Sequence, residues 1–316
     1  MKAPVSISLV IPVYGVEGFI GRFAESVLGQ SYPFIQFVFV NDGTKDSSIQ
    51  ILESLIDNKF SHLRDKIVIV TKENAGLPAA RKTGMEYATG EYVWHIDSDD
   101  WIEEGAVGKI AGCAARTDAD IIYFNFYKEY SDRTKLKVDK GYTVAEKAAY
   151  QRDMYNHRAH GCVWNKCVKR KLYTENEVHF PKYSYAEDTF LMSQLVGYAD
   201  SIVHLNEALY HYRKDNPHAI TRQGSQKRHR EAAMNFLSLY EIYRDAPVNP
   251  VASIFDDIFY RAGAYSVIYG LGLFKEYPYL AVNILKARLK GRADIWIPAQ
   301  IVLKLYSLFA NKLCRQ

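Results

Sequence analysis

Three acidic residues within four positions form the group of side chains in this chain best suited to chemistry. Asp97, Asp99 and Asp100 occur in the segment Asp97-Ser98-Asp99-Asp100, directly after an apolar run. Carboxylates two positions apart at a strand end can point into one cleft, where a hard divalent cation bridged to phosphate oxygens would neutralise them. A solvated turn, or an N-cap for the next helix, uses the same residue types. Taken alone, the segment fits the turn slightly better.

The elements that must position these carboxylates alternate in type along the first hundred residues. Short apolar runs rich in β-branched residues predict buried strands, and the segments between them have helical spacing. The expected strands are 8–13, 37–40, 67–70 and 92–96, and the expected helices are 19–28, 47–56 and 77–88. Apolar strands separated by helices predict an α/β fold with a mostly parallel sheet flanked by helices.

Polar side chains follow three of these strands. They are Tyr14, the turn-like tripeptide Asn41-Asp42-Gly43, and the acidic segment from Asp97 to Asp100. The Asn-Asp-Gly tripeptide alone is ordinary turn chemistry. Ligands of parallel sheets bind beyond the carboxyl ends of the strands, so we expect one binding site along this edge.

The second half of the chain changes character near Gly224. A further strand over 121–130 and a helix over 187–198 precede this point, and everything beyond about residue 226 has helical spacing. The expected C-terminal helices are 230–243, 251–274, 279–289 and 296–313. We therefore expect an α/β domain over residues 1–224 and a helical C-terminal region over 225–316.

Composition limits the class of protein. Charged residues make up 24% and hydrophobic residues 48%, which is ordinary globular usage and excludes a disordered or collagen-like chain. The net charge of +4 is too small to indicate a nucleic-acid partner. Four cysteines without a C-x-x-C pair indicate neither a disulfide framework nor a zinc module. With no signal-peptide pattern and no run of 18 apolar residues, we expect a cytoplasmic protein, or one peripheral on the inner face of the membrane.

Several segments taken in order resemble the family 2 glycosyltransferases, inverting enzymes that have the GT-A fold and use nucleotide sugars. The segments lie at the family's spacing between about residues 6 and 222, roughly two-thirds of the chain. They are Ile11–Tyr14, Val40–Asp46, Asn74–Arg81 with Gly84 and Gly90, His95–Trp101, Val163–Lys166, Glu187–Phe190 and Leu209–Arg213. One such motif is weak, but the series is specific.

The resemblance implies a role for individual residues. Residues 1–102 would bind the nucleotide sugar, with Pro12, Val13, Tyr14, Asp42, Arg81, Asp97 and Ser98 at the donor. Asp99 would be the principal ligand of Mn²⁺ or Mg²⁺, with Asp97 and Asp100 sharing metal contacts. Residues 103–224 would hold the acceptor, with Asp188 as general base and Glu187 as its neighbour. The resemblance assigns no role to His211 or His218.

Without the resemblance, Arg81 would be interpreted as a surface helix residue, and Glu187 and Asp188 as caps of the helix that they open. With it, a carboxylate can accept the acceptor's proton while a metal stabilises the departing diphosphate. The resemblance implies two substrates: a nucleoside-diphosphate sugar, expected to be UDP-linked, and a saccharide or lipid-linked saccharide acceptor. Polysaccharide, capsule or lipid-linked oligosaccharide assembly is the corresponding process.

Other classes fit the sequence less well. A nucleotidyltransferase would carry a G-x-G-x-R-type loop after the first strand, which Ile11–Gly15 is not. A P-loop enzyme and a dinucleotide dehydrogenase fail because their glycine motifs are missing. A nucleotide-sugar-binding protein that retains the fold without turnover remains the alternative, although Asp42, Asp97, Asp99 and Asp188 argue against decay of the site.

The C-terminal region is basic and apolar at once. Residues 275–316 hold eight basic and two acidic side chains around Trp296 and a run of apolar residues. A basic helix with an apolar face can lie on an anionic membrane surface. Packing on the catalytic domain, or a homodimer interface, explains the same pattern equally well.

Overall fold

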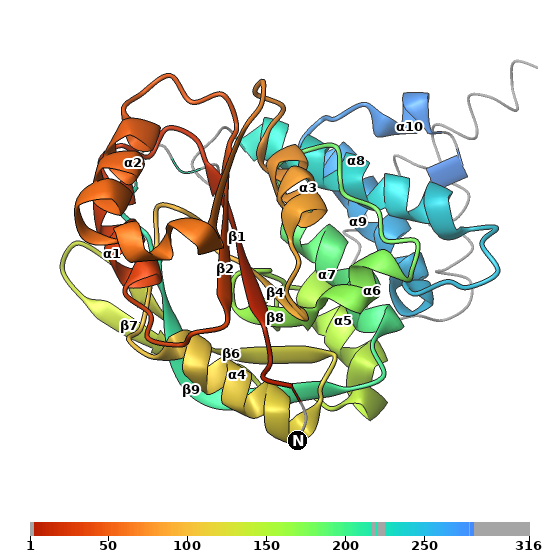
Figure 1. Cartoon of the computed structure of the whole chain (residues 1–316). Helices are drawn as coiled ribbons and strands as arrows, with labels where there is room; N and C mark the ends of the chain where they lie inside the picture. The colour runs from red at the N-terminus through yellow and green to blue at the C-terminus, as the bar shows by residue number, and fades with distance from the viewer. Residues whose placement is uncertain (1–2, 217–218, 220–224, 278, 281–316) are drawn as a thin grey trace, which may run out of the picture.

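Four parallel strands, three of them buried and the edge strand partly exposed, form the N-terminal part of one nine-stranded sheet (Figure 1). The computed structural model describes residues 3–216, 219, 225–277 and 279–280. The four strands are β1 (Ile7–Val13), β2 (Ile35–Asn41), β3 (Ile67–Thr71) and β4 (Tyr92–His95), in the spatial order β3-β2-β1-β4. The predicted strands are therefore confirmed, and their carboxyl ends share one edge of the sheet.

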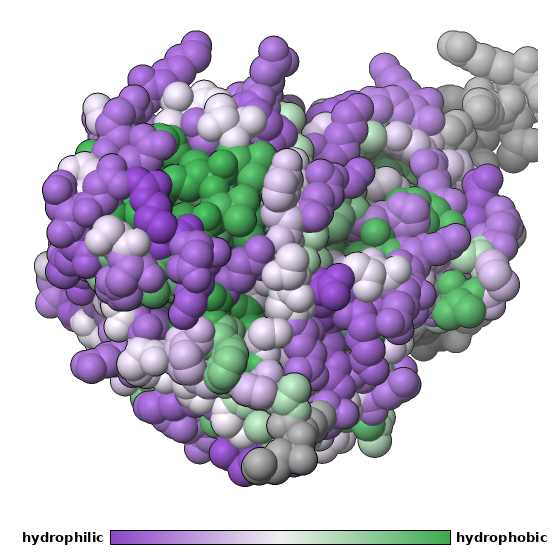
Figure 2. Space-filling view, viewed as in Figure 1, coloured by the Kyte–Doolittle hydropathy of each residue, from purple (hydrophilic) through white to green (hydrophobic). Residues whose placement is uncertain are grey.

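Helices cover both faces of these strands. On one face, α1 (Ile20–Leu28), α2 (Ser48–Lys59) and α4 (Ala106–Thr117) pack against side chains such as Leu9, Ile11 and Phe37. A 3₁₀ turn, η1 (Ser61–Lys66), follows α2. On the other face, α3 (Leu77–Tyr87) packs against Val10 and Val38. Figure 2 shows apolar side chains between α2 and α3, where the edge strand β3 is only partly covered.

The second half of the sheet is mixed. Its strands are β5 (Trp101–Ile102), β6 (Ile121–Glu129), β7 (Thr134–Lys137), β8 (Lys166–Lys169) and β9 (Ile202–Arg213). β8 runs antiparallel to β4 and β6, β9 runs parallel to β6 and antiparallel to β5, and β7 forms a hairpin with β6. The α/β class is thus confirmed, and most of the parallel strands belong to the N-terminal half of the sheet.

A second layer of helices lies over this mixed half. It consists of η2 (Val144–Glu146), α5 (Lys147–Tyr155), α6 (Arg170–Thr174) and α7 (Glu187–Tyr198). The helix α7 has the predicted bounds. Its Leu191, Leu195 and Val196 pack on Ile121 and Tyr123 of β6, which fixes the helix against the sheet.

The helical C-terminal region packs against this layer (Figure 1). It comprises α8 (Ser225–Tyr243), η4 (Ala252–Ile254), α9 (Phe255–Ile268) and α10 (Leu273–Glu276). Phe236 and Leu237 of α8 share an apolar cluster with Phe190 of α7 and Tyr155 of α5. Where one helix was expected over 251–274, the chain breaks after α9, because Gly270 and Gly272 take positive φ angles of 61° and 71°.

Some predictions lie outside the described residues. The expected boundary at Gly224, His218, the helix 296–313 and nearly all of the helix 279–289 belong to this group. In the part of the chain that is described, no helix is both long and apolar enough to cross a bilayer.

The close packing of α3 on the sheet gives a stability prediction. A Cβ atom on Gly84 would overlap Val10 Cγ1 and approach Val40 Cγ2 to 3.3 Å. Gly84→Ala should therefore lower the free energy of unfolding by about 1–3 kcal/mol, as overpacking does. Gly108→Ala in α4 is the matched control, since nothing lies within 4 Å of its Cβ position. Chemical denaturation measures both, and equal stability of the two variants would contradict the close packing.

Candidate active site

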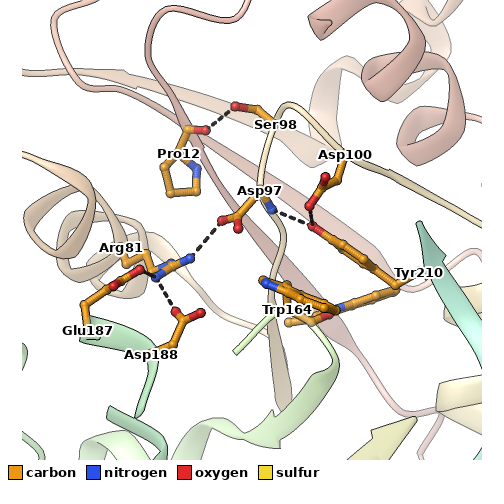
Figure 3. A network of polar contacts seen from close by, with 10 residues as sticks. Pro12, Arg81, Asp97, Ser98, Asp100, Trp164, Glu187, Asp188 and Tyr210 are labelled. Carbon is orange, nitrogen blue, oxygen red and sulfur yellow. Dashed lines mark hydrogen bonds and ion pairs between the residues drawn. The ribbon is translucent and has the colours of Figure 1, made fainter. Parts of the chain in front are cut away.

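Carboxylates from two distant segments meet at one buried arginine. Arg81 Nη1 donates to Asp188 Oδ1 at 2.7 Å and to Glu187 Oε1 at 3.1 Å, and Arg81 Nη2 donates to Asp97 Oδ1 at 2.8 Å. The arginine side chain is only 2% exposed, and the three carboxylates are partly exposed at 24% or less. Figure 3 shows the three acids arranged around the guanidinium group. The structure therefore brings Asp97, which was predicted to lie at the nucleotide sugar, next to Asp188, the predicted base, and its neighbour Glu187.

The position of Arg81 follows from the end of β2. Asp42 accepts hydrogen bonds from the backbone N–H groups of Ala75 at 3.1 Å and Gly76 at 2.9 Å, just before α3 begins. Lys72 Nζ adds an ion pair to the same carboxylate at 2.7 Å. Gly76 has a φ of 87°, which glycine adopts readily. Asp42 thus fixes the start of the helix that carries Arg81.

Mutual repulsion and burial set the protonation of Glu187 and Asp188. Burial and the neighbouring Asp188 raise the pKa of Glu187 to about 8, although Arg81 opposes this. Burial also raises the pKa of Asp188, with Arg81, Lys166 and a hydrogen bond from the Val163 backbone acting in the opposite direction. The two acids titrate as a unit. Near neutral pH a pKa of about 8 favours the protonated form of Glu187.

Arg81 itself stays charged. Burial lowers its pKa, but the attraction of Asp188, Asp97 and Glu187 is larger, so the net pKa is raised. A buried guanidinium of this kind can hold two ionised carboxylates without a net local charge of more than one. Direct contact of Arg81 with a nucleotide stays a prediction, because both terminal nitrogens already donate to carboxylates.

The acidic loop after β4 is held by residues of β9. Tyr210 Oη donates to Asp100 Oδ2 at 2.6 Å and accepts from the Asp97 N–H at 3.2 Å, and the Arg213 N–H donates to Asp100 Oδ1 at 2.7 Å. Asn216 Nδ2 donates to Asp99 Oδ2 at 2.7 Å. Burial and neighbouring acids raise the pKa of both Asp99 and Asp100. Both carboxylates carry a cost that a cation would relieve.

The donor set fits a divalent cation only with help from a ligand. Asp97 and Asp99 are partly exposed, whereas both oxygens of the 1% exposed Asp100 accept hydrogen bonds from the protein. Within the described residues, no three His, Cys, Asp or Glu side chains are placed to hold a metal ion. Hard oxygen ligands, including phosphate oxygens, are what Mg²⁺ and Mn²⁺ prefer. Two carboxylates completed by a diphosphate would satisfy this chemistry.

The other predicted donor residues lie along the carboxyl end of β1. Ser98 Oγ donates to the Pro12 carbonyl at 2.6 Å, and the Asp42 N–H donates to the Val13 carbonyl at 3.1 Å. These bonds tie β1 to the loops after β2 and β4. Tyr14 is 54% exposed at the same edge, so its ring is open to a ligand. Contact of Asp42 with a base stays a prediction, since its side chain is only 4% exposed.

Helix α8 fixes the backbone that leads into Glu187 and Asp188. The fully buried Asn235 donates from Nδ2 to the carbonyls of Tyr183 at 2.8 Å and Tyr185 at 3.0 Å. Its Oδ1 accepts from the Tyr183 N–H at 3.1 Å. Ala186 then takes a left-handed φ of 61° at the N-terminus of α7. The C-terminal region is thus part of the support of the predicted base.

The segment 160–166 supports the base from the other side. Lys166 is 1% exposed and donates from Nζ to the carbonyls of His160 and Cys162, both at 2.7 Å. Trp164 stacks on the Tyr210 ring with 4.6 Å between the ring centroids. The motif matches at Val163–Lys166 and Leu209–Arg213 marked these segments, but no sequence signal gave Lys166, Tyr210 or Asn235 a positioning role.

His211 does not join these carboxylates. Its Nδ1 lies 2.7 Å from Glu129 Oε1 and its Nε2 lies 2.8 Å from Glu103 Oε1. The ring stacks between Trp101 and Tyr127. Because neighbouring residues of a strand face opposite sides, His211 lies on the face of the sheet opposite Tyr210.

Comparison with known proteins gives a family match over half of the chain. Residues 8–175 match the model described as glycosyl transferase family 2. The chain is 31% identical over 221 residues to the putative glycosyltransferase EpsH of Bacillus subtilis, covering 67% of this chain and 62% of that protein. It is also 31% identical over 218 residues to glycosyltransferase GlyA of Streptococcus pneumoniae, covering 66% of this chain and 30% of that protein. The chain thus spans less than two-thirds of the length of these relatives.

Solved structures share the fold. The S. aureus TarS fragment 1–349, crystallised with UDP-GlcNAc, has a TM-score of 0.64 at 18% identity, covering 88% of this chain and 79% of that one. The mannosyltransferase PcManGT of Pyrobaculum calidifontis, in complex with GDP-Man and Mn²⁺, has a TM-score of 0.53 at 15% identity, covering 98% of this chain and 81% of that one. The expected GT-A fold is confirmed.

The raised pKa of Glu187 gives a prediction for stability. The pKa of Glu187 in the folded protein, about 8, lies above the ordinary value of 4.5 for glutamate, so between these values the folded state binds more protons than the unfolded state. Stability is therefore lost as the pH rises through this window, by up to about 1.4 kcal/mol per pH unit. Glu187→Gln should remove this dependence.

Unfolding of the wild type and of Glu187→Gln at several values between pH 5 and 8.5 tests this. As the pH rises, the free energy of unfolding of the wild type should fall relative to that of Glu187→Gln. Glu86→Gln, an exposed residue of α3, is the control. A difference between Glu187→Gln and wild type that is independent of pH would show that Glu187 is ionised throughout.

Proposed function

Because the chain belongs to glycosyl transferase family 2 and is therefore a transferase, we propose that it moves a sugar from a nucleoside-diphosphate sugar to an acceptor hydroxyl with inversion. One observation carries the proposal for the site: Arg81 joins Asp97, on the predicted donor side, to Asp188, the predicted base. Donor and acceptor must meet between such groups, and these two carboxylates share one guanidinium.

Asp188 is the group that we propose removes the proton of the acceptor hydroxyl. Its pKa is raised by burial, which makes its carboxylate a better proton acceptor than that of an ordinary aspartate, and Arg81 and Lys166 oppose part of that rise. Glu187, whose pKa of about 8 favours its protonated form near neutral pH, is a poorer candidate for the base. In an inverting reaction the base acts on the face of the sugar opposite the leaving group, as the general base of inverting glycosidases does.

Asp99 and Asp97 are the residues that we propose hold Mn²⁺ or Mg²⁺. When bound, the ion would neutralise the developing charge of the diphosphate. The raised pKa of Asp99 supports the assignment, since a cation would offset the repulsion from Asp97. Asp100 would act through Tyr210 and the Arg213 backbone, which hold the loop in shape. The Mn²⁺ in the PcManGT structure agrees with this choice of metal.

The donor is proposed to be UDP-linked. The TarS fragment of the same fold was crystallised with UDP-GlcNAc, which supports a uridine nucleotide without identifying the sugar. Tyr14, Asp42 and Arg81 would hold the base, ribose or diphosphate, with Pro12, Val13 and Ser98 forming the wall beside them. The exposed ring of Tyr14 is the side chain best placed for stacking on a base.

The acceptor is proposed to be a saccharide or lipid-linked saccharide in polysaccharide, capsule or lipid-linked oligosaccharide assembly. We propose residues 1–224 as the catalytic domain, divided near residue 102 into donor and acceptor parts, and residues 225–316 as its helical support. A cytoplasmic site of action, peripheral contact of the C-terminal segment with an anionic membrane, and a homodimer belong to the same proposal.

Metal dependence is the first prediction from this function. Sugar transfer and donor hydrolysis can both be measured as the release of UDP from a panel of UDP-sugars. Both reactions should cease with a chelator and return with Mn²⁺. Asp99→Asn should lower the rate by about 10² or more at saturating metal, while Asp65→Asn, an exposed aspartate of η1, should leave it unchanged. Full activity in the presence of chelator would contradict the metal site.

The identity of the base is the second prediction. Asp188→Asn preserves the shape of the side chain and removes its basicity. It should lower the rate of transfer by about 10² or more and leave the affinity for UDP near that of the wild type. Glu187→Gln should cost less, because Glu187 is proposed to be protonated already. If Asp188→Asn transferred sugar at a near-normal rate and Glu187→Gln did not, the base would be Glu187.

A further inference from the structure

Four lysines converge at the β6–β7 hairpin, and the proposed reaction does not use them. We call Lys128, Lys135, Lys137 and Lys214 the hairpin lysine cluster. Lys128 lies directly opposite Lys135 in the antiparallel pair, and Lys137 lies opposite Phe126. Lys214 follows β9 and holds its ammonium group 4.7 Å from the centre of the Tyr212 ring. Like charges directly opposite one another destabilise a sheet, so this arrangement has a cost.

The register places the cluster on the same face of the sheet as the candidate site. Phe126 is paired with Tyr210 and Lys128 with Tyr212 in the parallel β6–β9 ladder. Residues paired across strands share a face. Tyr210 is the residue that holds the Asp97–Asp100 loop, so the lysines extend the face on which that loop rests. In Figure 1 the hairpin lies at the edge of the molecule away from α8, α9 and α10.

Three of the four lysines have no carboxylate partner among the described residues. Within the described residues no ion pair joins Lys128, Lys135 or Lys137 to an acid. The nearby Glu129, Asp132 and Asp215 contact His211, Arg133 and Arg213 instead. Burial and the repulsion of Lys137, Lys214 and Lys135 lower the pKa of Lys128. An anion bound among these ammonium groups would relieve that repulsion.

One segment connects the cluster to the proposed base. The Phe126 ring, beside Lys128, packs against the rings of His160 and Trp164 with centroid distances of 4.8 and 4.7 Å. The same segment supplies the backbone hydrogen bond from Val163 to Asp188. The segment 160–164 therefore contacts both the hairpin face and the proposed base.

We propose that the hairpin lysine cluster binds a phosphate or diphosphate group carried by the sugar acceptor. Ammonium groups are common ligands of phosphate, and several together give both charge and hydrogen bonds. The inference rests on the proposed function, since it assigns the cluster to the acceptor. The donor diphosphate belongs at Asp97 and Asp99, where carboxylates would repel an anion in the absence of metal.

Binding of inorganic pyrophosphate to the full chain, measured by calorimetry in EDTA, tests the anion site. The triple variant Lys128→Gln/Lys135→Gln/Lys137→Gln should bind at least tenfold more weakly than wild type. The matched control Lys59→Gln/Lys66→Gln/Lys109→Gln changes three lysines of α2, η1 and α4 and should bind within twofold of wild type. Equal binding by wild type and the hairpin variant overturns the proposal. The single variant Lys135→Gln, at an exposed position, repeats the test if the triple variant is unstable.

Two further probes identify the source of the phosphate. Neutral vesicles carrying polyprenyl phosphate represent a lipid-linked acceptor, and a soluble glycerol-phosphate oligomer represents a phosphate-containing polymer. Binding of either that is lost in the hairpin variant supports the proposal and names the source, whereas binding of neither overturns it. Equal lysine-dependent binding to phosphatidylglycerol vesicles would also overturn it, in favour of membrane contact. Donor hydrolysis should be unchanged in the hairpin variant. If the wild type showed no donor hydrolysis, that result would refute the proposed function and would leave the anion site to the binding experiments.

Discussion

The ion contact between Arg81 and three carboxylates is the constraint on which the rest of the site depends. A guanidinium group that is 2% exposed would be very costly to bury without partners, and it keeps Asp97, Glu187 and Asp188 within hydrogen-bond distance. The carboxylates in turn need the positive charge of Arg81, because burial raises the pKa of Glu187 and Asp188. The predicted donor residue Asp97 and the predicted base Asp188 are thus bound to the same charge.

The surrounding fold can be understood as support for this contact. Asp42 fixes the start of α3, and the close approach of Gly84 to β1 holds that helix against the sheet. Asn235 of α8 fixes the backbone before α7. Tyr210 fixes the acidic loop. The four supports come from four different segments, so the site requires the N-terminal sheet, the mixed half of the sheet and the C-terminal helices together.

Local patterns were enough to predict much of this fold. The apolar runs predicted β1 to β4 and the spacing predicted α7, because a buried strand and a helix each need a repeating pattern within a few residues. The prediction of a single helix over 251–274 was wrong. The helical spacing of apolar residues continues past Gly270 and Gly272, but the backbone leaves the helical conformation at these glycines. The contact of Arg81 with Glu187 spans 106 residues, and no local pattern reports such a contact. Motif resemblance selected the residues, but only the fold showed that Arg81 faces carboxylates.

The central claim is that donor and acceptor meet between the Asp97–Asp99 segment and Asp188. Anomalous diffraction at the manganese edge, from crystals of the full chain with Mn²⁺ and a non-transferable UDP-sugar analogue, tests it most directly. We expect an anomalous peak within coordination distance of an Asp99 oxygen, with the diphosphate on the metal and the sugar carbon facing Asp188. A peak and nucleotide bound elsewhere, with Asp97, Asp99 and Asp188 unchanged, would contradict it.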